Sequence, residues 1–387
     1  MSGSIASPNR PAPVPGRSAG GAGSGGERSR VATSGRTTVR ATARTVPSAV
    51  PAPGQVTGQV TGQVTGQATG QAPGRAARVE RWQQRVRAGD HDWHVERYRH
   101  VPPRADDAVQ DGPDAVSGKP LCVLLHGTGA SAASWEALAP LLAARYDIVA
   151  PDLPAHARTR TSLSAALDID AQAVALQALI VAIEREPDLL IGHSAGAVLA
   201  AAWTLHRARG VTGGTAPHTG GARLVALNGA LLPLEGPAGW VFQPLARLSS
   251  GLGWLPRLFA RRAEREPGHV RRMLRATGSR IDDAMVARYR PLLADDAHVA
   301  GVLRMMAAWD LRGFAHRLAG LPVPLHLFAG DGDRTIPLRQ AHRLRSMLPD
   351  ATLDVLPGLG HLAHEEAPER VATAVLDRLD KPPGQVA

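Results

Sequence analysis

A serine between two glycines at residues 192–196 is the feature that most constrains how this chain can fold. The five residues read G-H-S-A-G, between an apolar run at 188–191, typical of a buried strand, and an Ala- and Leu-rich run at 195–205, typical of a helix. A serine on such a tight strand-to-helix turn needs small neighbours because the turn is strained. The following helix N-terminus also favours negative charge nearby. The pattern predicts Ser194 as a nucleophile; the alternative is a small-residue turn that only packs a strand against a helix.

Composition divides the 387 residues into a tail and a folded body. Residues 1–78 are rich in Gly, Ser, Thr, Pro, Ala and Arg, so they cannot offset their ordering entropy and we expect them to be disordered. A four-residue Q-V-T-G repeat marks part of this tail as low-complexity linker. The tail holds nine Arg and one Glu, so it carries +8 of the formal +10. Its charges are scattered, so we expect a solvated tail and no nucleic-acid partner; the alternative is a tail that contacts an anionic membrane surface or nucleic acid.

The chain has no apolar stretch long enough to span a membrane and no secretory signal. Its one cysteine, Cys122, lies in an apolar strand pattern and permits no internal disulfide. We therefore expect a cytoplasmic protein whose membrane contact, where it has any, is peripheral.

Apolar runs alternate with helical patterns from about residue 82 onward. This alternation predicts an α/β fold with a mostly parallel central sheet flanked by helices, whose ligands bind at the carboxyl ends of the strands. Expected strands lie at 93–98 (an edge strand), 121–125, 146–150, 189–191, 224–227, 325–328 and 352–356, and expected helices at 135–144, 171–183, 195–206, 338–347 and 368–379.

One interval interrupts the alternation. Residues 231–318 lack buried-strand runs and have helical patterns, which predicts a helical cap inserted over the nucleophile. The expected α/β core is then made of residues 79–230 and 319–380, and residues 381–387 form a short C-terminal tail.

A serine hydroxyl needs a base, usually a histidine that is oriented by a carboxylate. In this type of sheet the order along the chain is serine, acid, histidine. Asp333 follows the strand at 325–328 and is favoured over Asp331 because it lies further into the turn; both residues also suit ordinary turn chemistry. His361 follows the last strand in a glycine-rich loop, and His364 is its competitor.

A second glycine-rich turn, His126-Gly127-Thr128-Gly129, follows the strand at 121–125. Such a turn can direct a backbone N–H at a reacting oxygen, so the Thr128 and Ala195 amides are predicted as oxyanion-hole donors. The alternative is a loop that only leads to Ser134 as a helix N-cap. This chemistry needs no metal and no organic cofactor.

Together these motifs resemble the α/β-hydrolase superfamily over residues 82–380. The resemblance includes Pro151-Asp152-Leu153-Pro154 but departs at Ala155 and Ala157, where the usual pattern has glycine. The stretches at 125–131, 191–197, 227–233 and 358–366 are similar to the BchO-type magnesium-chelatase accessory proteins. That resemblance implies a place in bacteriochlorophyll synthesis and photosynthesis, with a tetrapyrrole as the candidate small-molecule substrate and magnesium chelatase subunits as candidate partners.

A tetrapyrrole is a flat apolar ring system with carboxylates at its rim. The expected cap contains aromatic and arginine side chains that suit such a ligand. Trp240, Phe242, Trp254 and Arg247 are therefore candidate substrate-binding residues. Two other interpretations stay open, in which these residues form the core of the cap or place it on a membrane surface.

Two functions remain in competition, beside a weaker third in which the basic tail tethers the protein to nucleic acid or a membrane. The first is a serine hydrolase of the esterase type, with Ser194, Asp333 and His361 as the catalytic residues. The second is a non-catalytic accessory protein that binds a porphyrin or the chelatase and uses the fold as a scaffold.

Overall fold

The computed structural model describes residues 56–57, 78–101, 118–209, 222–233 and 254–381. All of them belong to one structural unit. Most of the expected tail lies outside the described residues, and so do Trp240, Phe242 and Arg247. Within the repeat, Val56–Thr57 pair with a longer strand, which departs at these two residues from the expectation of disorder.

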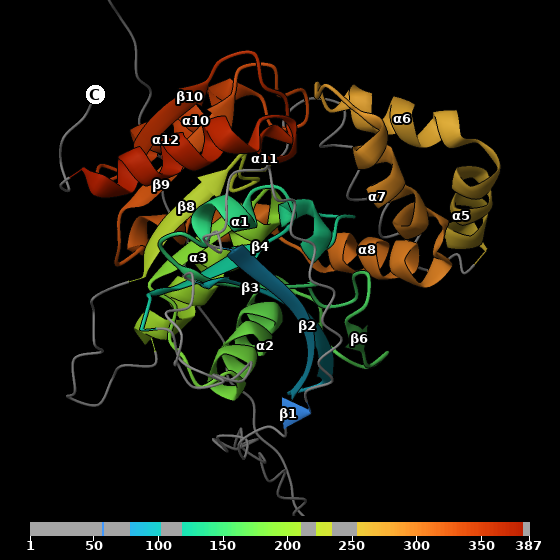
Figure 1. The fold of residues 1–387 in the computed structure, drawn as a ribbon, viewed down its shortest axis with the longest axis horizontal. Coiled ribbons are helices and arrows are strands. Elements are labelled where there is room, and N and C mark those ends of the chain that lie inside the picture. The colour runs from blue at the N-terminus through green and yellow to red at the C-terminus, as the bar shows by residue number, and fades with distance from the viewer. Residues whose placement is uncertain (1–55, 58–77, 102–117, 210–221, 234–253, 382–387) are drawn as a thin grey trace, which may run out of the picture. The chain divides into compact units, whose positions relative to one another are not determined.

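A ten-stranded sheet forms the centre of the unit (Figure 1), with the order β1-β2-β3-β5-β4-β7-β8-β9-β10 and β6 paired to β3. The strands are β1 (Val56–Thr57), β2 (Arg78–Ala88), β3 (His91–Val101), β4 (Leu121–Leu125), β5 (Asp147–Pro151), β6 (Arg160–Thr161), β7 (Leu189–His193), β8 (Arg223–Leu227), β9 (Leu325–Gly330) and β10 (Thr352–Leu356). Pairing is parallel from β5 to β10 and antiparallel where β2 and β3 join. The predicted α/β fold with a mostly parallel sheet is confirmed.

The expectation of an edge strand at residues 93–98 is wrong. These residues belong to β3, which pairs with β2 on one side and with β5 on the other. β2 escaped prediction because most of its residues are polar and only partly buried, so it forms no apolar run. Gly89, at φ +57°, and Asp90 make the two-residue turn of this hairpin, a local signal that the sequence does carry.

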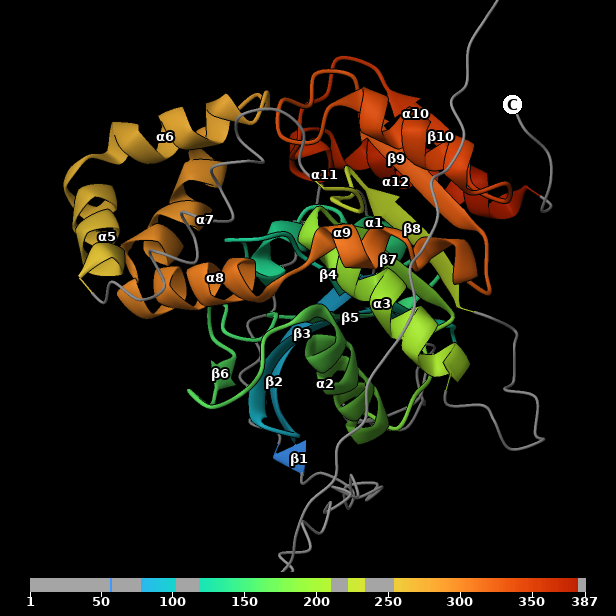
Figure 2. The same ribbon diagram turned by 180° about the vertical axis from the view of Figure 1, so that it is seen from behind.

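Helices cover both faces of the sheet. The helices are α1 (Ala139–Leu142), α2 (Ile169–Ala182), α3 (Ala195–Arg209), α5 (Leu255–Arg265), α6 (Pro267–Ala276), α7 (Asp283–Ala294), α8 (Asp296–Ala308), α9 (Leu311–Ala315), α10 (Leu338–Met347), α11 (Ala363–Glu366) and α12 (Pro368–Asp380), with 3₁₀ turns η1 (Ala132–Trp135) and η2 (Leu318–Gly320). One apolar core lies under α2, α3 and α10 (Figure 2) and the other under α1 and α12. Cys122 is fully buried in β4, as predicted.

The segment between β8 and β9 is helical in its described part. We call α5 to α9 with η2 the helical insertion (Leu255–Gly320). Aspartates 282, 295 and 310 cap the N-termini of α7, α8 and α9, each accepting a backbone N–H. Its small apolar core includes Val270 and Met285 and extends to Ala130 and Leu362 of the sheet unit. The insertion therefore packs on loops at the carboxyl ends of the strands.

No helix in the described ranges has the length and apolar character needed to cross a membrane.

Candidate active site

Ser194 occupies the strained turn that the sequence predicts, between β7 and α3. Its φ is +52°, in the left-handed region that non-glycine residues rarely adopt. A Cβ on Gly192 would lie 2.3 Å from the Ala197 nitrogen, and one on Gly196 would lie 2.0 Å from the Leu125 oxygen. Both positions therefore require glycine, and the close packing holds Ser194 at the carboxyl end of β7.

Asp333 and His361 form a buried pair. His361 Nδ1 lies 2.8 Å from Asp333 Oδ2, and each residue is 6% exposed. The other carboxylate oxygen, Oδ1, accepts hydrogen bonds from the amides of Thr335 at 2.7 Å and Ile336 at 2.8 Å. An N–H at Nδ1 that faces this fixed carboxylate leaves Nε2 as the acceptor nitrogen of the imidazole.

The competing candidates have other surroundings. Asp331 is exposed and accepts a hydrogen bond from the Gly358 amide at 2.6 Å, which closes a turn. His364 is fully buried, with its ring 4.5 Å from the Trp135 ring and 4.4 Å from that of His193. Burial lowers the pKa of His364 to about 3, so its imidazole is neutral. The structure thus pairs His361 with Asp333 and uses His364 for packing.

Two polar side chains, one beside Ser194 and one after β8, bond the backbone of the His361 loop. His193 Nε2 lies 2.9 Å from the His361 carbonyl oxygen. The Asn228 amide donates to the carbonyls of Gly360 at 2.7 Å and His361 at 2.9 Å, and its oxygen accepts from the Gly330 amide at 3.0 Å. Asn228 therefore ties the end of β9, which leads to Asp333, to the loop that carries His361. Sequence reasoning did not assign it this role.

The predicted oxyanion-hole loop lies against the serine turn. A Cβ on Gly127 would meet His193 Nδ1 at 2.8 Å and the Ser194 Cβ at 3.1 Å. Among the described residues, neither the Thr128 amide nor the Ala195 amide has a hydrogen-bond acceptor. Thr128 is exposed, and the donor predicted here is its backbone amide. Ser134 lies inside η1, and Ser131 occupies the N-cap position.

His126 holds this loop in place. Its Nδ1 lies 2.8 Å from the Gly127 oxygen, and its Nε2 accepts the Leu153 amide at 2.9 Å. Burial lowers the pKa of His126 to about 4, so the ring stays neutral, with one donor and one acceptor nitrogen.

The turn between α6 and α7 contacts both loops of the Asp333–His361 pair. Arg334 donates its amide to the Thr277 carbonyl at 3.0 Å, and the Leu362 amide donates to Ser279 Oγ at 2.8 Å. Glu366 accepts the Gly360 amide at 2.8 Å and the Arg280 amide at 3.0 Å. The helical insertion therefore braces the backbone on each side of His361.

A buried carboxylate attaches α7 to the sheet unit. Glu365 accepts a hydrogen bond from the Tyr289 hydroxyl at 2.7 Å and from Arg288 Nε at 3.1 Å. Burial raises the pKa of Glu365 to about 7, although both partners favour its charged form.

Ala155 and Ala157 have the backbone conformation that the usual glycines would take. Their φ values are +60° and +45°. From α8, His298 accepts the Ala157 amide at 2.9 Å, and a Cβ on Gly301 would lie 2.0 Å from the Ala155 oxygen. Alanine at these two positions therefore carries backbone strain that glycine would not.

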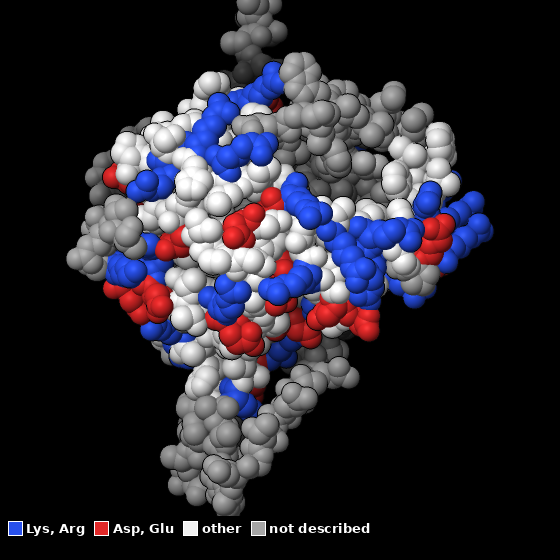
Figure 3. Space-filling model, turned by 90° about the horizontal axis from the view of Figure 1, so that it is seen from above, with Lys and Arg blue, Asp and Glu red and all other residues white. Residues whose placement is uncertain are grey.

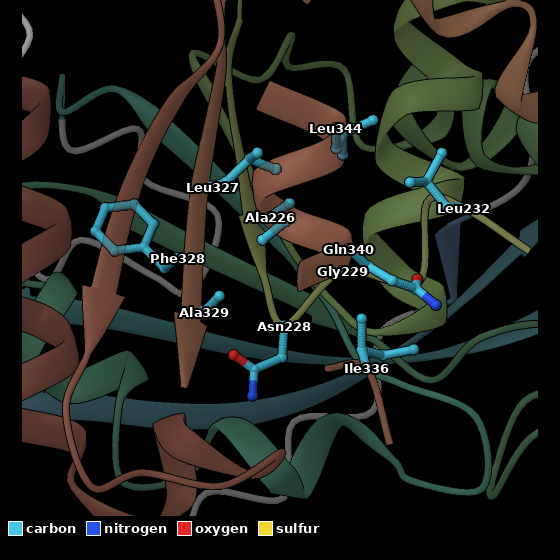
Figure 4. Close-up of a pocket in the computed structure, with 11 residues that line it drawn as sticks. Ala226, Asn228, Gly229, Leu232, Leu327, Phe328, Ala329, Ile336, Gln340 and Leu344 are labelled. Atoms are coloured by element: carbon cyan, nitrogen blue, oxygen red, sulfur yellow. The ribbon is translucent and has the colours of Figure 1, made fainter. Parts of the chain in front are cut away.

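A small cavity lies behind Asn228, between β8, β9 and α10 (Figure 4). It has room for about one water molecule, and the buried Gln340 Oε1 beside it has no hydrogen-bond partner within the described ranges. The cavity is too small to hold a substrate.

Trp254 is the one predicted substrate-binding residue that is described. It precedes α5 and is 58% exposed. The structure does not bury it against the Asp333–His361 pair.

Comparison with known proteins identifies the family. The model of the alpha/beta hydrolase family matches residues 122–374. The chain is 35% identical over 297 residues to the magnesium-chelatase 30 kDa subunit of Rhodobacter capsulatus, which covers 76% of this chain and 94% of that protein. The chain therefore belongs to the alpha/beta hydrolase family, and the predicted resemblance to magnesium-chelatase accessory proteins is confirmed.

Two further relatives agree on the fold. The chain is 27% identical over 278 residues to 2-hydroxy-6-oxononadienedioate/2-hydroxy-6-oxononatrienedioate hydrolase 2 of Pseudomonas putida, which covers 69% of this chain and 90% of that enzyme. An alpha/beta hydrolase fold protein from Burkholderia ambifaria superposes with a TM-score of 0.55 at 22% identity, over 76% of this chain and 97% of that structure.

Proposed function

We propose that this protein is a serine hydrolase that cleaves carboxylic esters, with Ser194 as nucleophile, His361 as base and Asp333 as the residue that orients His361. The observation that carries the proposal is the buried 2.8 Å contact between His361 and Asp333, joined through His193 to the turn that bears Ser194.

The proposed reaction has two steps. Ser194 Oγ attacks the ester carbonyl while His361 Nε2 takes its proton, and the Thr128 and Ala195 amides stabilise the oxyanion. His361 then protonates the leaving alkoxide, which leaves an acyl-serine. Water attacks the acyl-serine with His361 again as base, releasing the carboxylic acid and restoring Ser194.

We further propose that residues 231–318 form a cap over Ser194 and that the substrate is a tetrapyrrole ester. The relative from Rhodobacter capsulatus is named for a chelatase that handles magnesium, which supports a role in bacteriochlorophyll synthesis beside magnesium chelatase subunits.

Labelling with a fluorophosphonate probe tests the proposed nucleophile. We expect the wild type to label, and Ser194→Ala and His361→Ala not to label while keeping a wild-type circular dichroism spectrum. Asp333→Asn should lose labelling and its matched control Asp331→Asn should keep it, because only Asp333 contacts the imidazole. Ester turnover should fall on the order of 10⁴-fold for Asp333→Asn. Equal labelling of the two variants would contradict the assignment.

A scaffold without catalysis is the second candidate, because the 35% identical relative is named as a chelatase subunit. Complementation separates the two functions. A strain that lacks this gene should recover pigment synthesis with the wild type and fail with Ser194→Ala. Full rescue by Ser194→Ala would favour the scaffold.

A further inference from the structure

Large apolar side chains gather on the outside of α5 and α6. Trp254, Leu258 and Phe259 are 58%, 55% and 45% exposed, and Met273 of α6 is 41% exposed. They are four of the nine exposed large apolar residues of the described ranges, yet they lie within twenty positions of one another. Such clustering marks a contact surface rather than scattered exposure.

The same segment is strongly basic. Residues 254–280 contain eight Arg, no Lys, and only two acids, Glu264 and Glu266. Figure 3 shows the resulting concentration of basic side chains at the right of the view, over α5 and α6. Arg261, Arg265 and Arg275 have no acidic partner among the described residues.

Helical geometry places two of the apolar and two of the basic side chains in and just before α5 on one face. At about 100° per residue, Trp254, Leu258, Arg261 and Arg265 fall on a single stripe. The buried residues of α5 are Pro256, Ala260 and Ala263, which lie on the opposite side. The outward stripe therefore presents an aromatic ring and a leucine next to two guanidinium groups.

We infer that the outward stripe of α5, formed by Trp254, Leu258, Arg261 and Arg265, binds a bilayer that contains anionic lipid. Tryptophan and leucine enter the boundary between headgroups and acyl chains, and guanidinium groups pair with lipid phosphates. The unpartnered arginines supply the charge complementarity that selects an anionic surface. The contact is interfacial and requires no spanning helix.

The stripe lies on the same helical insertion that contacts the candidate site. Further along this insertion, the α6–α7 turn contacts the His361 loop through Ser279 and Arg280. The inference does not depend on the proposed hydrolase activity, because the surface residues take no part in that chemistry.

Sedimentation of the full-length protein with lipid vesicles tests the inference. We expect binding to phosphatidylcholine vesicles with 30% phosphatidylglycerol and weak binding to phosphatidylcholine alone. Each surface arginine contributes about five-fold to partitioning, so Arg261→Gln and Arg265→Gln combined should weaken binding about 25-fold. The control combines Arg160→Gln and Arg312→Gln, which remove two exposed arginines elsewhere and should affect binding far less.

Two further variants test the apolar contribution. Leu258→Ser should weaken binding, whereas Leu163→Ser, at a site that is 88% exposed, should not. Brominated lipid should quench tryptophan fluorescence in the wild type and less in Trp254→Phe. The inference is overturned if the arginine variant binds like the wild type, which would indicate binding through the basic tail. It is also overturned if the wild type does not bind anionic vesicles, which would favour an acidic protein as the partner of this surface.

Discussion

The loops that carry Ser194, Asp333 and His361 differ sharply from the helical insertion in how closely they are packed. Each of the three side chains is less than 10% exposed, and hydrogen bonds from several elements fix the backbone around them. On α5, by contrast, aromatic and basic side chains extend into solvent. The close packing suits a site whose geometry must be fixed, and the exposed surface suits the inferred contact with a lipid bilayer.

We expect the largest contrast when one glycine in each region is replaced by alanine, because only the site loops should lose stability. In Gly196→Ala the new Cβ would lie 2.0 Å from the Leu125 oxygen, a rigid backbone atom. We expect a loss of more than about 3 kcal/mol of folding free energy, or no folded protein. In Gly268→Ala of α6 the nearest atom is the flexible end of Arg272 at 3.4 Å.

Gly268→Ala should therefore be neutral or stabilising by up to about 1 kcal/mol. Urea denaturation of both variants gives the comparison directly. A Gly196→Ala protein as stable as the wild type would show that the serine turn is looser than its packing indicates.

An intermediate effect is expected at Asn228, where glycine keeps the backbone and removes the amide. Asn228 has φ +46°, which glycine adopts without strain. Asn228→Gly loses the hydrogen bonds to Gly360, His361 and Gly330, so we expect a loss of about 1–3 kcal/mol in stability. Ester turnover should fall about 10- to 100-fold through kcat, because the His361 loop shifts.

Gln340→Leu is the matched control, since Gln340 lines the same cavity but does not bond the loops of the site. Its kcat should stay close to that of the wild type. If Asn228→Gly lowers stability but leaves kcat unchanged, Asn228 is only structural.

Local sequence patterns were enough to predict the serine turn and the pairing partners Asp333 and His361. Ser194 and Asp333 follow the largely buried strands β7 and β9, His361 follows the partly buried β10, and nearby glycines mark each turn. The oxyanion-hole donors and the substrate-binding residues stay predictions. Asn228 could not be found this way because its partners lie more than 100 residues along the chain, at Gly330 and Gly360.

The fold was also predictable from apolar runs, and the prediction was incomplete where a strand forms no such run. Strands that are buried on both faces form apolar runs in the sequence. β2 is mostly polar and only partly buried, so it was not predicted. Ala155 and Ala157 illustrate another limit, since alanine gives no sign of the left-handed backbone that both residues adopt.

The smallest effect is expected where these two alanines meet the insertion. Ala157→Gly removes the Cβ that disfavours φ +45° and should stabilise the fold by up to about 1 kcal/mol. Ala155→Gly should gain less, because Ala155 lies close to α8, where a Cβ added to Gly301 would be 2.9 Å from the Ala155 Cβ. Ala287→Gly, exposed in the middle of α7, is the control with opposite sign and should cost about 1 kcal/mol. Thermal unfolding of the three variants measures the order. If Ala157→Gly destabilises the fold as much as Ala287→Gly does, alanine is not strained at position 157. The contact between His298 and this loop would then be what fixes the left-handed backbone.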